Sequence, residues 1–75
     1  MRLVKVETNP MVVNNYILKA KMILETDDKP GAGSFAFDRN YIEVALTIMA
    51  KERAVTKRQM EAIDDVFGRT KGYML

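Results

Sequence analysis

Four basic side chains lie within eight residues of one another, and phosphate binding is the chemistry that they could perform. They are Lys51, Arg53, Lys57 and Arg58. Thr56 begins a predicted helix among them, so the free backbone N–H groups and the positive end of that helix face the same region. The alternative is an ordinary solvated corner, in which Lys51 and Arg53 complement the carboxyl end of their own helix.

The helix that follows this corner could also contact bases. A glutamine amide can pair with adenine and an arginine with guanine, and both residue types lie in its first turn. Glu61, Asp64 and Asp65 come directly afterwards and repel phosphates, so only the first turn can lie close to DNA. The expected nucleic-acid-binding residues are therefore Lys51, Arg53, Lys57, Arg58 and Gln59.

The composition excludes several other chemistries. The chain of 75 residues has no Cys and no His, which rules out disulfides, the usual zinc sites and catalysis by Ser–His–Asp or Cys–His groups. Asp64 and Asp65 are adjacent and would diverge by about 100° on a helix, so they cannot form an acid–base pair. Glu61 and Asp65 could share a helix face and together bind a divalent metal. We favour the alternative, in which they lie on an ordinary solvated face. We predict that the protein is not an enzyme and binds no metal or cofactor.

Two helices with a tight joint would position the basic residues. Asp38 is a suitable N-cap for a helix over 38–53, whose apolar positions recur on one face. Thr56 opens a capping box, with glutamine three residues later, and so starts a further helix over 57–67. These patterns predict a helix-turn-helix corner at 54–56.

The segment 50–63 resembles the DNA-binding helix-turn-helix. The likeness is carried by a small residue at the helix contact, apolar residues that close the corner and a cap on the second helix: Ala50, Val55, Met60, Ile63 and Thr56. Ala54 falls at the turn position of this motif. The start of the second helix is also similar to helix starts in phage-encoded replication and accessory proteins. The resemblance implies a small accessory protein that contacts DNA.

The amino-terminal third permits two interpretations. Residues 1–8 alternate loosely and predict an extended arm or a short strand, which would need a partner. Asn9 is suited to cap a helix over 10–26 that begins with proline. The rival interpretation pairs Lys5–Val13 with Tyr16–Leu24 in a β-hairpin. We favour the helix because the apolar residues follow its period.

This predicted helix carries a second apolar stripe, formed by Met11, Leu18 and Met22. The interpretation that we favour covers the stripe within the domain, as in the middle helix of a small bundle. The other interpretation makes it a partner-binding surface. Methionine is common on adaptable protein-binding surfaces, and the chain has six.

The remaining segments are predicted connections. Residues 26–34 contain Pro and two Gly and predict a loop, without the spacing of a phosphate-binding loop. Phe35 and Phe37 would anchor this loop in the core. Gly68 stands where a helix C-cap usually falls. The apolar end of the chain either frays or covers one end of the core.

Taken together, the sequence predicts an all-α fold. We expect one domain over 1–75, with three helices, the corner and an amino-terminal arm, that forms a homo-oligomer. The net charge of +2 does not by itself imply nucleic acid. No apolar run is long enough to span a membrane, and we expect a cytoplasmic protein. Its expected role is a nucleic-acid-associated accessory or regulatory factor, or alternatively a protein-interaction module such as a small inhibitor or assembly factor.

Overall fold

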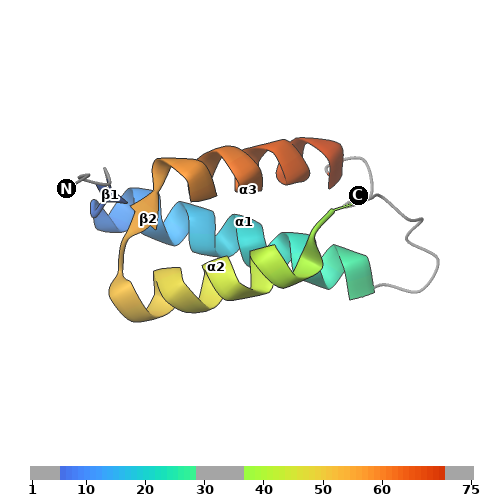
Figure 1. Ribbon diagram of the computed structural model, residues 1–75, viewed down its shortest axis with the longest axis horizontal. Helices are drawn as coiled ribbons and strands as arrows, with labels where there is room; N and C mark the ends of the chain where they lie inside the picture. Colours follow the sequence, from blue (N-terminus) through green and yellow to red (C-terminus); the bar gives the residue numbers. More distant parts are fainter. Residues whose placement is uncertain (1–5, 29–36, 71–75) are drawn as a thin grey trace.

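Three helices form most of the protein in a computed structural model, which describes residues 6–28 and 37–70. They are α1 (Pro10–Asp28), α2 (Arg39–Glu52) and α3 (Lys57–Thr70). In Figure 1, α1 and α3 run in the same direction and α2 runs antiparallel to both. The all-α, three-helix prediction is confirmed, and the amino-terminal third forms a helix rather than a β-hairpin.

Helix α1 is the element on which the other two helices pack. α2 and α3 each lie along it, whereas they approach each other much less closely. The core is aliphatic and draws on all three helices and on the joint between the last two: Val13, Ala20, Ile23, Ile42, Ala45, Met49, Val55, Ile63 and Val66. Burial of these side chains is the main favourable contribution to folding.

The predicted starts of the first two helices are confirmed by their caps. The Asn9 side chain accepts a hydrogen bond from the backbone N–H of Met11 at 2.9 Å. The Asp38 carboxylate accepts one from the backbone N–H of Tyr41 at 3.0 Å. Each cap satisfies an N–H group that has no partner within its own helix.

The carboxyl end of α1 lies two residues beyond the predicted one, so the loop predicted from residue 26 begins too early. Thr26 is only 3 % exposed, and burial holds it in the last turn. Asp27 and Asp28 are disfavoured at the negative end of a helix. Arg39, at the start of α2, compensates for both by pairing with Asp27 at 2.5 Å and with Asp28 at 3.0 Å.

The amino-terminal arm contains a short strand, and the joint before α3 supplies its partner. Strand β1 (Val6–Glu7) pairs antiparallel with β2 (Val55–Thr56), and Val6 lies opposite Thr56. Both β2 residues are β-branched, as is common in strands. Val55 is fully buried. The joint therefore closes the end of the core and also holds the amino-terminal arm.

The predicted C-cap at Gly68 is wrong, because α3 continues through Thr70. Thr70 is fully buried, and its hydroxyl donates to the backbone carbonyl of Val66 at 2.6 Å. Burial of this residue extends the helix by nearly one turn beyond the predicted end. Gly68 lies within the helix, with no left-handed backbone conformation.

Part of the loop prediction is confirmed. Phe37 is partly buried and packs against the core. Phe35, the glycines before it and the apolar end of the chain lie outside the described residues. Among the helices that the structure describes, none is both long and apolar enough to cross a membrane.

Candidate functional site

The joint between α2 and α3 turns at a single left-handed residue. Arg53 has φ 56° and ψ 39°, and its backbone N–H donates to the carbonyl of Met49 at 2.9 Å. The motif likeness places the turn at Ala54, but within the described ranges Arg53 is the residue other than glycine with positive φ. The left-handed conformation costs a residue with a side chain about 1 kcal/mol or more. The hydrogen bond that Arg53 donates to Met49 at the end of α2 offsets this cost.

The capping box that starts α3 is confirmed in both directions. The backbone N–H of Thr56 donates to Oε1 of Gln59 at 2.8 Å, and the backbone N–H of Gln59 donates to Oγ1 of Thr56 at 3.0 Å. The cap occupies one lone pair of Oε1 of Gln59 and orients the amide. A contact with adenine through both amide atoms would therefore have to share Oε1 with the N–H of Thr56.

The joint brings four exposed cations to one end of the molecule. Lys51 and Arg53 come from the end of α2, and Lys57 and Arg58 from the first turn of α3 (Figure 1). No carboxylate within residues 6–28 and 37–70 forms an ion pair with any of the four. We call these four residues the basic corner. Their shared position is the one that the sequence predicted.

Cations elsewhere in the described ranges mostly have carboxylate partners. Lys19 pairs with Asp64 at 2.9 Å, and Arg69 with Asp65 at 3.1 Å. Arg39 bridges three carboxylates, and the hydrogen bonds that it donates to Asp27 and Asp28 raise its pKa. Exposed Lys21 on α1 forms no ion pair with a described carboxylate, which is also true of the corner residues. Among the described residues, cations without ion pairs are therefore concentrated at the corner.

The charge on α3 changes sign after its first turn. Lys57 and Arg58 precede Glu61, Asp64 and Asp65, and these three side chains are all exposed. A phosphate could therefore approach the first turn, but the next turns would repel it. This arrangement suits a contact at the end of the helix better than insertion of the whole helix into a groove.

A polar cluster between α1 and α3 was not predicted from the sequence. Asp64 accepts hydrogen bonds from the Tyr16 hydroxyl at 2.7 Å and from Nζ of Lys19 at 2.9 Å. The ammonium group of Lys19 also lies 4.8 Å from the centre of the Tyr16 ring and 5.4 Å from that of Phe67. These contacts attach α3 to α1 at its middle. Tyr16 and Lys19 are three residues apart on one helix, which is the signal that could have indicated a shared partner.

The cluster changes the pKa values of two of its members. The hydrogen bond to Asp64, partial burial and the charge of that carboxylate together raise the pKa of Tyr16 from 10.0 to about 12. Burial alone would raise the pKa of Asp64, but the hydrogen bonds from Lys19 and Tyr16 outweigh it and hold the pKa below its ordinary value. The ionised form of Asp64 is therefore favoured by its contacts with Lys19 and Tyr16.

The stripe on α1 is exposed, so the interpretation that covers it within the domain is wrong. Met11 is 82 % exposed and Leu18 is 56 % exposed, while Met22 is partly buried outside the core. α2 and α3 pack on the face of α1 that carries Val13, Ala20 and Ile23, and the stripe lies on the opposite face. The sequence had placed these three residues on one face, and the structure shows which way that face points.

Comparisons with known proteins leave the function to be argued from this geometry. No family model matches the chain, and searches of curated proteins and of solved structures gave no significant match. No group of three or more metal-ligating side chains comes together in the parts of the chain that the structure describes. The basic corner and the stripe on α1 are the two surfaces predicted from the sequence, and the structure places most of their side chains in contact with solvent.

Proposed function

We propose that the protein is a small non-enzymatic factor that associates with nucleic acid and contacts phosphates through the basic corner. The observation that carries this proposal is the position at one joint of four exposed cations that form no ion pair with a carboxylate of the described residues. A cation already paired with a carboxylate has to lose that partner before it binds phosphate. The corner residues have no such cost, so each can displace counterions from a nucleic acid.

The geometry of the joint limits how nucleic acid would be held. The first turn of α3 has backbone N–H groups without helical partners, and its positive end lies beside Lys57 and Arg58. Glu61 lies one turn further along and would repel a phosphate placed there. Contacts would therefore be mainly to the backbone of the nucleic acid, with weak sequence preference. An accessory role, rather than specific recognition of an operator, fits this mode of binding.

Binding of a labelled duplex and of a labelled single strand, followed by fluorescence anisotropy at low salt, tests the proposal. We expect Lys57→Glu to weaken binding at least about tenfold, since it removes a phosphate contact and adds a repulsive charge. The matched control is Lys21→Glu, which makes the same charge change at an exposed position of α1 away from the corner. Equal losses in the two variants would show a non-specific charge effect and would contradict the proposal.

A second candidate function uses a different surface of the molecule, the α1 stripe. The exposure of Met11 and Leu18 favours a protein-interaction module, such as a small inhibitor or assembly factor, that binds through the α1 stripe. Such a partner would bury methionine and leucine side chains that water now covers, which is a favourable change.

Affinity capture separates this second candidate from the first. A partner bound through the stripe would be lost with Leu18→Asp and kept with Lys57→Glu. The converse result, in which capture depends on Lys57 and is abolished by nuclease treatment, would indicate indirect capture through nucleic acid. It would remove the support for the stripe as the binding surface.

A further inference from the structure

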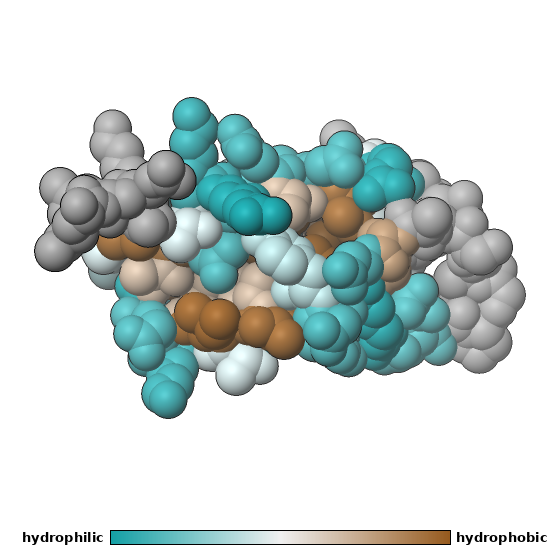
Figure 2. Space-filling view, in the orientation of Figure 1, coloured by the Kyte–Doolittle hydropathy of each residue, from teal (hydrophilic) through white to brown (hydrophobic). Residues whose placement is uncertain are grey.

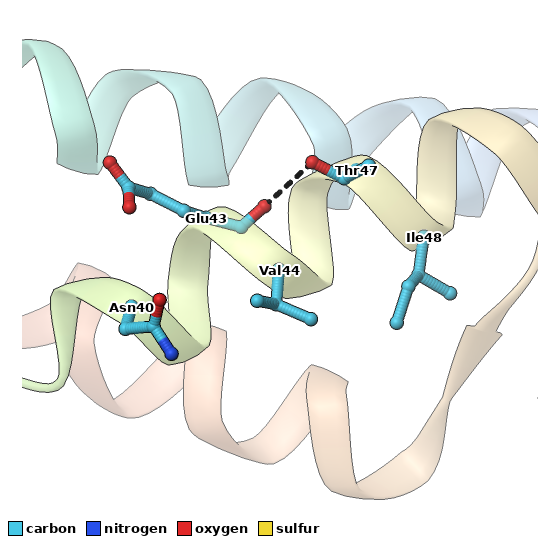
Figure 3. A pocket seen from close by; sticks show the side chains of 5 residues that line it. All are labelled: Asn40, Glu43, Val44, Thr47 and Ile48. Atoms are coloured by element: carbon cyan, nitrogen blue, oxygen red, sulfur yellow. Dashed lines mark hydrogen bonds between the residues drawn. The ribbon is translucent and has the colours of Figure 1, made fainter.

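A second unpartnered surface lies on α2. Val44 and Ile48 are 47 % and 42 % exposed, which is high for aliphatic side chains one turn apart. With Asn40, Glu43 and Thr47 they line an open depression of about 250 Å³. Figure 3 shows the Val44 and Ile48 side chains extending to one side of α2, away from α1. We call this surface, together with Lys51 in the next turn, the outer face of α2.

The charges along the outer face have opposite signs at its two ends. Glu43 lies near the amino end of α2 and Lys51 near the carboxyl end, with Val44 and Ile48 between them. Figure 2 shows a hydrophobic patch over α2 with hydrophilic residues at both ends of it. The charged pair, Glu43 and Lys51, is centred one residue away from the centre of the apolar pair, Val44 and Ile48. One residue corresponds to about 1.5 Å along a helix axis. The outer face is therefore nearly complementary to a copy of itself turned end to end.

We propose that the outer face of α2 binds a second copy of this chain in an antiparallel arrangement with twofold symmetry. In that arrangement Val44 and Ile48 pack against the same residues of the second copy, and each Lys51 lies near the Glu43 of the other copy. A twofold interface of this kind uses one surface twice and closes on itself as a dimer. Antiparallel helices also place unlike dipole ends side by side.

The side-chain contacts of the free chain are compatible with this pairing. Lys51 has no ion pair in the described ranges, so it is available. Glu43 accepts from Nε of Arg39 at 3.1 Å through Oε2, which leaves Oε1 for a second cation. The hydroxyl of Thr47, in the middle of the face, donates to the carbonyl of Glu43 within its own helix (Figure 3). It therefore brings no unpaired donor into the contact.

The α1 stripe is more exposed but does not complement itself in this way. Leu18 lies at the middle of that stripe, and an antiparallel copy would bring Glu25 opposite Met11 and Lys21 opposite Asn15. No ion pair results from either contact. The charges thus select the outer face of α2, rather than the α1 stripe, for contact with a second copy. The two surfaces lie on different helices, and both can be occupied at once.

The expected dimer is weak. One helix face carries few aliphatic side chains, and stable interfaces bury about 800 Å² on each partner. We therefore expect a dissociation constant between about 10 µM and about 1 mM, set mainly by the apolar contact and adjusted by the two ion pairs. Sedimentation equilibrium of the full chain over this concentration range measures it.

The first pair of variants tests which surface is used. Ile48→Glu puts a charge at the centre of the contact, and we expect it to leave the protein monomeric throughout the range. Leu18→Glu makes the same change at an exposed apolar residue of α1, and we expect its dissociation constant to match that of the wild type. A wild type that stays monomeric, or a dimer lost with Leu18→Glu and kept with Ile48→Glu, would overturn the proposal. Circular dichroism shows whether each variant is folded.

A charge exchange tests the orientation of the two copies. Glu43→Lys and Lys51→Glu should each weaken self-association by about tenfold, because each converts two ion pairs into repulsive pairs. The double variant Glu43→Lys/Lys51→Glu restores opposite charges across an antiparallel contact and should recover most of the wild-type affinity. Affinity that stays low in the double variant, with its helical content intact, would rule out the antiparallel arrangement.

The proposal does not depend on nucleic-acid binding, and the experiments keep the two apart. Ile48→Glu changes no residue of the basic corner, so loss of the dimer in this variant is independent of phosphate contacts. In the proposed dimer the two corners lie at opposite ends of the antiparallel α2 pair. Arg53, Lys57 and Arg58 of each corner therefore remain exposed when the dimer forms, while Lys51 lies near the Glu43 of the other copy.

Discussion

The hydroxyl of Tyr16 donates a hydrogen bond to Oδ2 of Asp64 at 2.7 Å and so connects α1 to α3. The same carboxylate accepts from Lys19, whose ammonium group lies over the Tyr16 ring. In a domain with a small aliphatic core, such a cluster adds direction to packing that is otherwise non-directional. It fixes the position of α3 along α1, and thereby the position of the basic corner at the start of α3.

Tyr16 should make the stability of the domain depend on alkaline pH. Its pKa is raised from 10.0 to about 12, so the folded state holds this proton more tightly than the unfolded state. The contribution to stability is complete below pH 10 and is lost as the pH rises through about 12. Urea denaturation should show that Tyr16→Phe loses about 1 kcal/mol near neutral pH and lacks this part of the alkaline dependence. Parallel pH profiles for the two proteins across this window would contradict the assignment.

Asp64 should matter more than its neighbour Asp65. Asp64→Asn weakens the bonds from both Tyr16 and Lys19 and should lower the free energy of unfolding by about 1 kcal/mol, a modest value because the site is partly solvated. Asp65→Asn is the matched control. Asp65 pairs with Arg69 one turn away in the same helix, and its loss should cost less than about 0.5 kcal/mol.

The dependence of stability on acid pH provides a second test of Asp64→Asn and Asp65→Asn. The pKa of Asp64 is held below 3.8, so its stabilising contribution is complete above that pH and is lost as the pH falls further. Asp64→Asn should therefore be less sensitive to acid than the wild type, with Asp65→Asn resembling the wild type. If Asp65→Asn were the less acid-sensitive of the two, the roles assigned to these carboxylates would be reversed.

The capping box at the start of α3 should contribute to stability through both of its residues. Thr56→Ala removes the cap on the backbone N–H of Gln59 and should cost about 1 kcal/mol. Thr47→Ala is the matched control, since the Thr47 hydroxyl donates to a carbonyl inside α2 and alanine is the better helix former there. Gln59→Glu keeps an acceptor for the N–H of Thr56 and should leave the stability nearly unchanged. Equal effects of the two threonine substitutions would show that the cap contributes nothing beyond helix propensity.

Gly68 should be a site where alanine stabilises the protein. The residue lies inside α3 and is exposed, and an added Cβ would meet no atom within 4 Å other than those of the adjacent residues and the helix's own backbone. Gly68→Ala should therefore raise the free energy of unfolding by about 0.5 to 1 kcal/mol through helix propensity. Thermal denaturation measures this as an increase in Tm. A decrease would mean that α3 ends near residue 68 in solution, as the sequence alone had predicted.

Features that depend on neighbouring residues in the chain were predictable. The caps at Asn9 and Asp38 and the box of Thr56 with Gln59 each involve residues two or three positions apart, and their partners are fixed by helix geometry. The gathering of cations at the corner follows from the same local patterns. The position of the basic corner depends only on where α2 ends and where α3 begins, and the sequence indicated both.

Features that depend on tertiary contacts were not predictable. The partner of β1 is the joint at Val55–Thr56, about fifty residues away in the chain, and no local pattern connects the two. The end of α3 depends on burial of Thr70 rather than on Gly68. Whether the Met11 and Leu18 stripe is covered depends on which side of α1 the other helices occupy. In each case the deciding energy comes from packing, which single-sequence patterns do not contain.

The salt dependence of nucleic-acid binding tests the basic corner most directly. Four phosphate contacts predict a slope of about −3.6 for the logarithm of the association constant against the logarithm of salt concentration on duplex DNA. Lys57→Gln/Arg58→Gln removes two of these contacts, and the slope should fall to about −2, with Lys21→Gln retaining the wild-type value. A slope that is unchanged in the double variant, or no binding by the wild type at low salt, would contradict the account.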